Sequence, residues 1–293
     1  MEKLGLIMNT EKIAIVVDSG TDVPQSIIEK YNMYVIPLLI HYNDGEYRDK
    51  VDISADAVYD RLEEEIPKTS LPSMEVVVST LQMAINDGYK KIIIVSISSA
   101  LSGTYNALRL AAEEISDAEI FVVDTKNIGI GAGFTAITAA KLIGKGYSFS
   151  VIIDKLTDAI ENTVIYFCVD TLKYLQKGGR IGTVAAAVGT AFYLKPIISC
   201  DKEGKYYTAS KTLGRKQSLQ KAMQMAGNFA KEFENVNFAI ANGRAEKEAK
   251  ELIEKAKEFI TNTGLIVTGQ ISPALVIHTG PGLIGICVQK KVY

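Results

Sequence analysis

The feature that most constrains the fold is a unit that recurs through the first half of the chain, from Lys12 onward. Each unit has a short β-branched run, a turn with small polar residues, and an amphipathic stretch. Continuous apolar strands that alternate with helices are typical of a parallel sheet covered on both faces. The pattern predicts an α/β domain over residues 11–160. Its strand-and-turn segments read KIAIVVDSGTD, KIIIVSISSALSG and EIFVVDTKNIGIGAG.

The second half of the chain departs from this pattern. A polar helical stretch within 148–163 ends the alternation, and a predicted hairpin with its turn at Asp201–Gly204 follows. These features predict an α+β domain with a mixed sheet over residues 161–293. The expected fold class is therefore α/β with two domains. The small-residue apolar run Val184–Leu194 predicts a helix, which could either line a ligand cavity or simply pack in the core.

Composition argues against several classes of partner and location. The chain has 32 Lys and Arg against 34 Asp and Glu and shows no strongly basic stripe, so we expect no nucleic acid partner. Its three cysteines are far apart, which favours neither a disulfide framework nor a zinc site. Neither a signal peptide nor a bilayer-length apolar run is apparent. We expect a cytoplasmic protein.

Cofactor motifs are also missing from the glycine-rich and histidine-containing segments. GIGAG does not have the spacing of the dinucleotide fingerprint, and KGGRIG lacks the lysine of a phosphate-binding loop. Only His41 and His278 could supply imidazole to a metal, and neither has an acidic cluster at ligand spacing. We therefore expect neither a cofactor nor a bound metal.

Three predicted loops gather hydroxyls, glycines and one imidazole: KTSLPS, SSALSGTYN and HTGPG. In open parallel sheets, ligands bind beyond the carboxyl ends of the strands. Ser102 follows such a strand and lies near the start of the next helix, where free N–H groups favour an anion. The alternative is that Ser102 only caps that helix.

A serine hydrolase is a second hypothesis. Ser102 and His278 could converge with Asp18 or Asp124 to form a triad. The chain lacks the G-x-S-x-G elbow that often carries such a serine. By its flanking residues alone, His278 could equally be a core histidine.

Taken together, these segments resemble the DegV family, and the resemblance runs almost from end to end. The best understood members of this family are bacterial fatty-acid-binding proteins that serve a fatty acid kinase. The matching motifs are VVDSGTDVP, IPLLIHYNDGEYRD, PKTSLPS, SSALSGTYNA, VVDT, VDTLKYLQKGGRIG, LKPIIS and HTGPG.

The resemblance implies a long-chain fatty acid, such as palmitate, stearate or oleate, in an apolar tunnel between two domains. It also implies that Thr69, Ser102 and His278 hold the carboxylate. Gly280 and Gly282 would then let the backbone approach the ligand closely.

The resemblance further implies a non-catalytic subunit that presents its fatty acid to a separate kinase for phosphorylation to acyl phosphate. Transient contact with a membrane surface is compatible with such a role. Arg180 and Arg215 are the expected docking residues for the catalytic subunit of the kinase. One departure affects this partner, because Leu213 stands where the family pattern has an arginine. The alternative for Arg180 is that it satisfies carbonyls of its own glycine turn.

Overall fold

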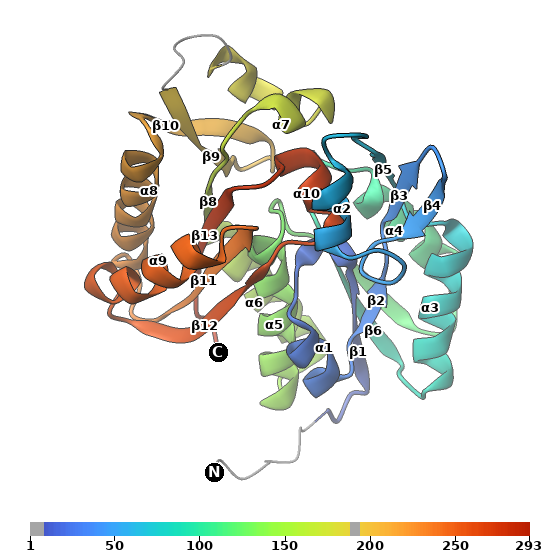
Figure 1. Cartoon of the computed structure of the whole chain (residues 1–293). Coiled ribbons are helices and arrows are strands. Elements are labelled where there is room, and N and C mark those ends of the chain that lie inside the picture. Colours follow the sequence, from blue (N-terminus) through green and yellow to red (C-terminus); the bar gives the residue numbers. More distant parts are fainter. Residues whose placement is uncertain (1–8, 188–193) are drawn as a thin grey trace.

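A computed structural model describes residues 9–187 and 194–293 of the chain. Its N-terminal domain is built on a parallel sheet with the strand order β2-β1-β6-β7 (Figure 1). The central strands β1 and β6 are rich in Ile and Val and almost entirely buried, as expected of a sheet covered on both faces. The strands are β1 (Ile13–Asp18), β2 (Tyr34–Ile36), β6 (Lys91–Ser96) and β7 (Glu119–Asp124).

Helices cover this sheet on both faces. On one face, α3 (Met74–Asn86) and α4 (Thr104–Glu113) pack on the sheet, while α5 (Ile130–Gly144) contacts β1 and β6 from the other face. Ser73 caps α3 by accepting a hydrogen bond from the Val76 N–H, at 3.3 Å. The domain also contains the 3-10 helix η1 (Ser19–Thr21) and the short helices α1 (Gln25–Tyr31) and α2 (Ala55–Arg61).

A small antiparallel sheet with the order β4-β3-β5 projects from this domain. It consists of β3 (Leu39–Tyr42), β4 (Gly45–Arg48) and β5 (Lys68–Ser70). Thr69 was expected in a loop, but it lies in β5 and pairs with Ile40 of β3. The prediction was wrong because a three-residue strand is stabilised by a distant partner strand, which local sequence does not reveal.

The C-terminal domain has a mixed sheet with the order β10-β9-β8-β13-β11-β12. β11 and β12 pair in parallel, and the other neighbours pair antiparallel, including the predicted hairpin of β9 and β10. These sheets confirm the expected fold class. The strands are β8 (Thr163–Cys168), β9 (Leu194–Cys200), β10 (Tyr206–Leu213), β11 (Val236–Gly243), β12 (Thr263–Gln270) and β13 (Leu283–Lys290).

Helix α5 joins the two domains into one core. Thirteen of its fifteen residues are buried, and it contacts β8, β11 and β13 as well as the N-terminal sheet. Thr138 of α5 donates a hydrogen bond to Gln289 of β13 at 2.8 Å. α8 (Arg215–Ala230) and α9 (Glu246–Phe259) cover the outer face of the second sheet. α6 (Phe149–Glu161) ends just before β8, and the division at residues 160 and 161 stays a prediction.

The predicted helix over Val184–Leu194 is wrong at both ends that the structure describes. Gly182–Ala187 form the 3-10 helix η2, which begins at a positive φ of 50° at Gly182, and Leu194 already belongs to β9. Residues 188–193 of this predicted helix lie outside the described residues. No residue of η2 lines the cavity described below. Among residues 9–187 and 194–293, no helix has the length and apolar character needed to cross a bilayer.

Candidate functional site

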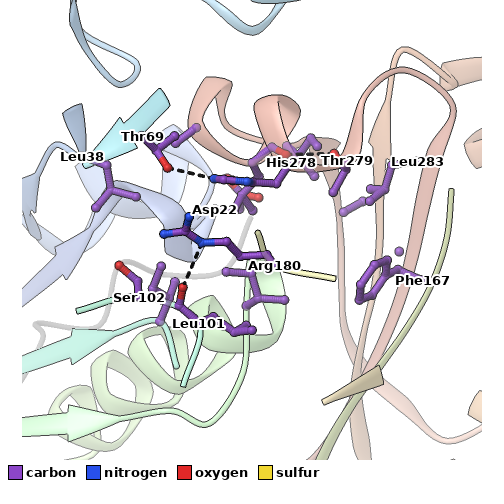
Figure 2. A pocket seen from close by; sticks show the side chains of 18 of the residues that line it. Asp22, Leu38, Thr69, Leu101, Ser102, Phe167, Arg180, His278, Thr279 and Leu283 are labelled. Atoms are coloured by element: carbon purple, nitrogen blue, oxygen red, sulfur yellow. Dashed lines mark hydrogen bonds between the residues drawn. The ribbon is translucent and has the colours of Figure 1, made fainter. Parts of the chain in front are cut away.

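An apolar cavity lies between the two domains. Its volume of about 240 Å³ is more than ten times the ~15 Å³ that one water molecule requires. It lies just below the range of roughly 300–1,000 Å³ that is typical of ligand pockets. Both domains contribute to its wall (Figure 2). The apolar part of the wall is formed by Leu38, Leu71, Ile97, Leu101, Ile128, Ile130, Ile165, Phe167, Tyr206, Ala241, Ile271, Ala274, Leu275 and Leu283.

Polar side chains border the same cavity. Thr69 comes from β5, Ser102 from the turn before α4, and His278 from the last turn of α10 (Pro273–Thr279). The three residues expected at the head group therefore border one cavity, although they are widely separated in the sequence. Arg180, which follows the short helix α7 (Lys173–Lys177), also borders it.

His278 is the central polar group of this site. Its Nε2 lies 2.8 Å from Thr69 Oγ1, across the interface between the domains (Figure 2). Burial, together with the positive charge of Arg180, lowers the pKa of His278 to about 4. The imidazole is therefore neutral at neutral pH. In the tautomer with its proton on Nε2, it donates to Thr69 and leaves the threonine hydroxyl hydrogen free for a ligand oxygen.

The other side of this imidazole packs against the glycine turn after α7. A Cβ added at Gly178 would lie 2.2 Å from His278 Nδ1. His278 Nδ1 is buried and has no hydrogen-bond partner among the described residues. Gly178 is thus required for the ring to reach its position beside Thr69.

Ser102 has contacts that fit both of its predicted roles. Its Oγ accepts a hydrogen bond from the Thr104 N–H at 3.2 Å and lies 2.8 Å from Thr104 Oγ1. Gly103 is the N-cap of α4 and Thr104 is its first residue. Ser102 therefore lies one residue before the cap, and its bond to the Thr104 N–H supports the capping alternative only in this displaced form. Ser102 also borders the cavity, where its hydroxyl can turn to a ligand. Both hypotheses for Ser102 stay open.

Arg180 points toward the cavity from its turn (Figure 2). Its Nη1 donates to the Gly178 carbonyl at 2.7 Å, and its Nε donates to the Leu101 carbonyl at 3.4 Å. It therefore does satisfy a carbonyl of its own glycine turn, as the alternative hypothesis held. Its position in the cavity wall was missed, because nothing in the sequence signals where this loop folds back.

Arg215 lies outside the cavity at the start of α8. Its guanidinium forms ion pairs with Asp170 and Glu248, each at 2.6 Å. These bonds are internal to the chain and occupy the donors that docking would use. Leu213, at the position where an arginine was expected, is 64% exposed. The docking role of both arginines stays a prediction.

The geometry of a serine hydrolase is not formed in the described residues. Asp18 accepts hydrogen bonds from Gly20, Ser96 and Ile97, and Asp124 accepts them from Ser99 and Lys126. No hydrogen bond joins His278 to Ser102 or to either acid, because its Nε2 is already bonded to Thr69.

The glycines of the HTGPG turn have a different role from the expected one. Gly280 and Gly282 both have positive φ, at 68° and 85°. A Cβ at Gly280 would lie 2.2 Å from the Tyr174 ring, and one at Gly282 would lie 2.2 Å from the Asp170 carboxylate. Neither glycine borders the cavity. They permit close packing of the protein against itself, so the expectation of a close approach to ligand was wrong.

No group of three or more His, Cys, Asp or Glu side chains in residues 9–187 and 194–293 is arranged to hold a metal ion. The three cysteines are unpaired, with Cys168 and Cys287 buried.

Comparison with known proteins places the chain in a family. The model of the DegV family, described as uncharacterised proteins, matches residues 12–291. The chain belongs to the DegV family. A DegV domain-containing protein of Clostridium acetobutylicum is 42% identical over 284 residues, with 96% of this chain and all of that protein covered. A DegV domain-containing protein of Staphylococcus aureus is 30% identical, with 96% of this chain and 99% of that protein covered.

Solved structures of other DegV-family proteins have the same fold. A fatty-acid-binding DegV protein of Thermus thermophilus aligns with a TM-score of 0.88 and 26% identity, over 95% of this chain and 99% of that one. DegV of Bacillus subtilis, a fatty acid binding protein, aligns with a TM-score of 0.87 and 26% identity, over 96% of this chain and 99% of that one. A stearic acid-binding protein of Eubacterium ventriosum aligns with a TM-score of 0.87 and 27% identity, over 95% of this chain and 98% of that one. The predicted family and its two-domain fold are confirmed.

Proposed function

We propose that this chain binds a long-chain fatty acid, such as palmitate, stearate or oleate, in the cavity between its domains. The observation that carries the proposal is an apolar cavity whose polar lining includes the hydroxyls of Thr69 and Ser102, the neutral imidazole of His278 and a guanidinium. Burial of an acyl chain contributes roughly 0.8 kcal/mol per CH₂. The ligands named for the structural neighbours of Thermus thermophilus, Bacillus subtilis and Eubacterium ventriosum support the same ligand class.

In this proposal, Thr69, Ser102 and His278 hold the carboxylate. A carboxylate that enters a buried site without hydrogen-bond donors loses much of the binding energy that its acyl chain contributes. Both hydroxyls can donate, and the charge of Arg180 at the same cavity favours an anion.

We further propose that the chain is a non-catalytic subunit that presents the carboxylate to a separate kinase, which converts it to acyl phosphate. A surface cleft borders Thr69 and His278 from the outside. The rim of this outer cleft carries both signs of charge, from Lys68, Lys173, Lys177, Arg180, Glu63, Glu64 and Glu65. Its lysines favour a partner that brings acidic residues or phosphate groups to this rim. Transient contact with a membrane surface during loading fits the same role.

The test of fatty acid binding begins with protein purified from bacteria. Denaturing extraction followed by lipid mass spectrometry should yield one acyl species in stoichiometric amount. The delipidated protein should then bind added palmitate, stearate or oleate. Absence of both a stoichiometric lipid and binding of added fatty acid would refute the proposal. A fluorophosphonate probe tests the alternative, a lipid-directed serine hydrolase that uses Ser102 and His278. Such an enzyme would be labelled at Ser102, whereas a carrier would not.

A further inference from the structure

The short helix α10, which carries His278, is held at its first turn by the opposite domain. Backbone N–H groups at the start of a helix have no partner within the helix. In α10 these include the N–H groups of Ser272 and Ala274, whereas Pro273 between them has none. The Ser272 side chain makes no capping hydrogen bond. These two donors therefore need acceptors from elsewhere.

Two carboxylates of the N-terminal domain supply the acceptors. Asp22 Oδ1 accepts from the Ser272 N–H at 2.9 Å, and Asp49 Oδ1 accepts from the Ala274 N–H at 3.1 Å. The partners are 250 and 225 residues apart in the sequence. Carboxylates are favoured at this position because the helix dipole is positive at its N-terminus.

Both carboxylates are themselves fixed in place. Asp49 is fully buried, and its Oδ2 accepts from Ser19 Oγ at 2.6 Å. Ser19 Oγ in turn accepts from the Leu38 N–H at 3.0 Å. Asp22 pairs with Lys50 Nζ at 3.0 Å. Because every member has a partner within the N-terminal domain, the network acts as a rigid support for α10.

The other end of α10 meets the same domain through the bond between His278 and Thr69. The seven-residue helix is therefore attached to the N-terminal domain at both ends, over about 10 Å. We infer that Asp49, assisted by Asp22, is a positioning residue of the head-group site, which fixes α10 so that His278 Nε2 donates to Thr69 and leaves the threonine hydroxyl hydrogen for the ligand carboxylate. This inference rests on the proposed function. Asp49 does not border the cavity, whereas Asp22 does, so Asp49 gives the cleaner test.

A double-mutant cycle with stearate tests whether Asp49 acts through His278. Asp49→Ala should weaken stearate binding about fivefold or more when His278 is present, which corresponds to the loss of one well-placed donor. In a His278→Ala background, the same change should alter affinity by less than about twofold, because there is no imidazole left to position. Asp49→Asn keeps an acceptor oxygen for Ala274 and should largely restore binding.

Proton NMR of the imidazoles supplies a readout that lost stability alone would not change. The chain has only two histidines, so a His41→Gln variant assigns both signals. In the parent, His278 should titrate far below the usual range, and in Asp49→Ala its pKa should rise as the ring becomes hydrated. Loss of a nearby negative charge by itself would lower a histidine pKa, so an upward shift reports movement of the ring.

Leu252→Ala is the stability control. Leu252 lies on the buried face of α9, in the outer core of the C-terminal domain. No residue of α9 borders the cavity. This variant should lower the melting temperature and leave stearate affinity unchanged. Parent-like affinity in Asp49→Ala, or an equal loss with and without His278, would overturn the inference. If the parent itself fails to bind stearate, the proposed function is wrong, and the His278 titration alone still decides the positioning role.

Discussion

At the scale of single residues, the proposed head-group site requires hydroxyls whose hydrogen atoms are free for a ligand. Thr69 meets this condition when the neutral imidazole of His278 donates to it. Ser102 meets it only if its contacts with Thr104 leave the hydroxyl hydrogen free. The two roles of Ser102 therefore predict different results for one substitution.

Ser102→Ala should lower fatty acid affinity by about 1–3 kcal/mol if the hydroxyl holds the carboxylate. Stability of the unliganded protein should then change little. Capping alone predicts a loss of about 1 kcal/mol in unfolding free energy and unchanged affinity. Paired denaturation and binding curves distinguish the two, with Ser99→Ala as control, because Ser99 lies in the same turn and does not border the cavity.

Burial of His278 also predicts a pH dependence of stability. Its pKa falls from 6.5 to about 4 on folding, so the unfolded chain binds more protons between these values. The contribution of His278 to the free energy of unfolding is on the order of 3 kcal/mol. It is fully present above about pH 6.5 and is lost as the pH falls to about 4. Asp18 and Asp49 act in the opposite direction, since burial raises the pKa of each to about 6.

The histidine effect is isolated by comparing the parent with His278→Gln in urea denaturation at several pH values. The unfolding free energy of the parent relative to the variant should decrease as the pH is lowered from 7 to 4. Asp18 and Asp49 are present in both proteins, so their contributions cancel in this difference of unfolding free energies. A difference that stays constant across this range would show that His278 is accessible to protons in the native state.

At the scale of elements, the sequence predicted those segments whose pattern is local. β1, β6 and β7 are runs of β-branched residues with helices after them, and the turn of the β9–β10 hairpin has its own signal in Asp201–Gly204. β5 was not predicted, because its three residues depend on pairing with β3. Among site residues, Thr69, Ser102 and His278 came from the family resemblance. The place of Arg180 in the cavity depends on how its loop folds back and was missed.

The β9–β10 hairpin reaches across to the N-terminal domain at its turn. Gly204 has a φ of 80°, and its carbonyl accepts a hydrogen bond from Ser98 Oγ at 2.9 Å. A Cβ at this position would lie 2.1 Å from Ser98 Oγ and 3.0 Å from Lys126 Cα. The turn thus fits against the end of β6 only with glycine.

Gly204→Ala should therefore destabilise the protein by more than the ~1 kcal/mol that a positive φ alone costs an alanine. Gly88→Ala is the matched control, because Gly88 also has a positive φ but has nothing within 4 Å of an added Cβ. Chemical denaturation of both variants measures the difference. Equal losses would mean that the hairpin turn moves away from Ser98 without cost.

At the scale of the whole molecule, the cavity is a product of the interface between the domains. α5 lies between the two large sheets. The cavity wall takes residues from strands of the C-terminal sheet and, on the N-terminal side, from β5, from loops and from the start of α5. The outer cleft lies beside the polar end of that cavity and shares Thr69, Arg180 and His278 with it. A partner that reaches the cavity through this cleft therefore meets the lysines and glutamates of its rim.

Docking of the proposed kinase is best tested on the lysines of this rim, because Arg180 also borders the cavity and Arg215 is held in internal ion pairs. Lys173→Glu and Lys177→Glu should reduce acyl-phosphate formation by added kinase, most strongly at low salt, since rim charges act mainly on encounter rates. Fatty acid affinity should not change. Lys255→Glu on the exposed side of α9 makes the same charge change away from the cleft. The kinase should phosphorylate the fatty acid bound to this control variant at the parent rate. Parent rates for both rim variants at every salt concentration would exclude this docking face.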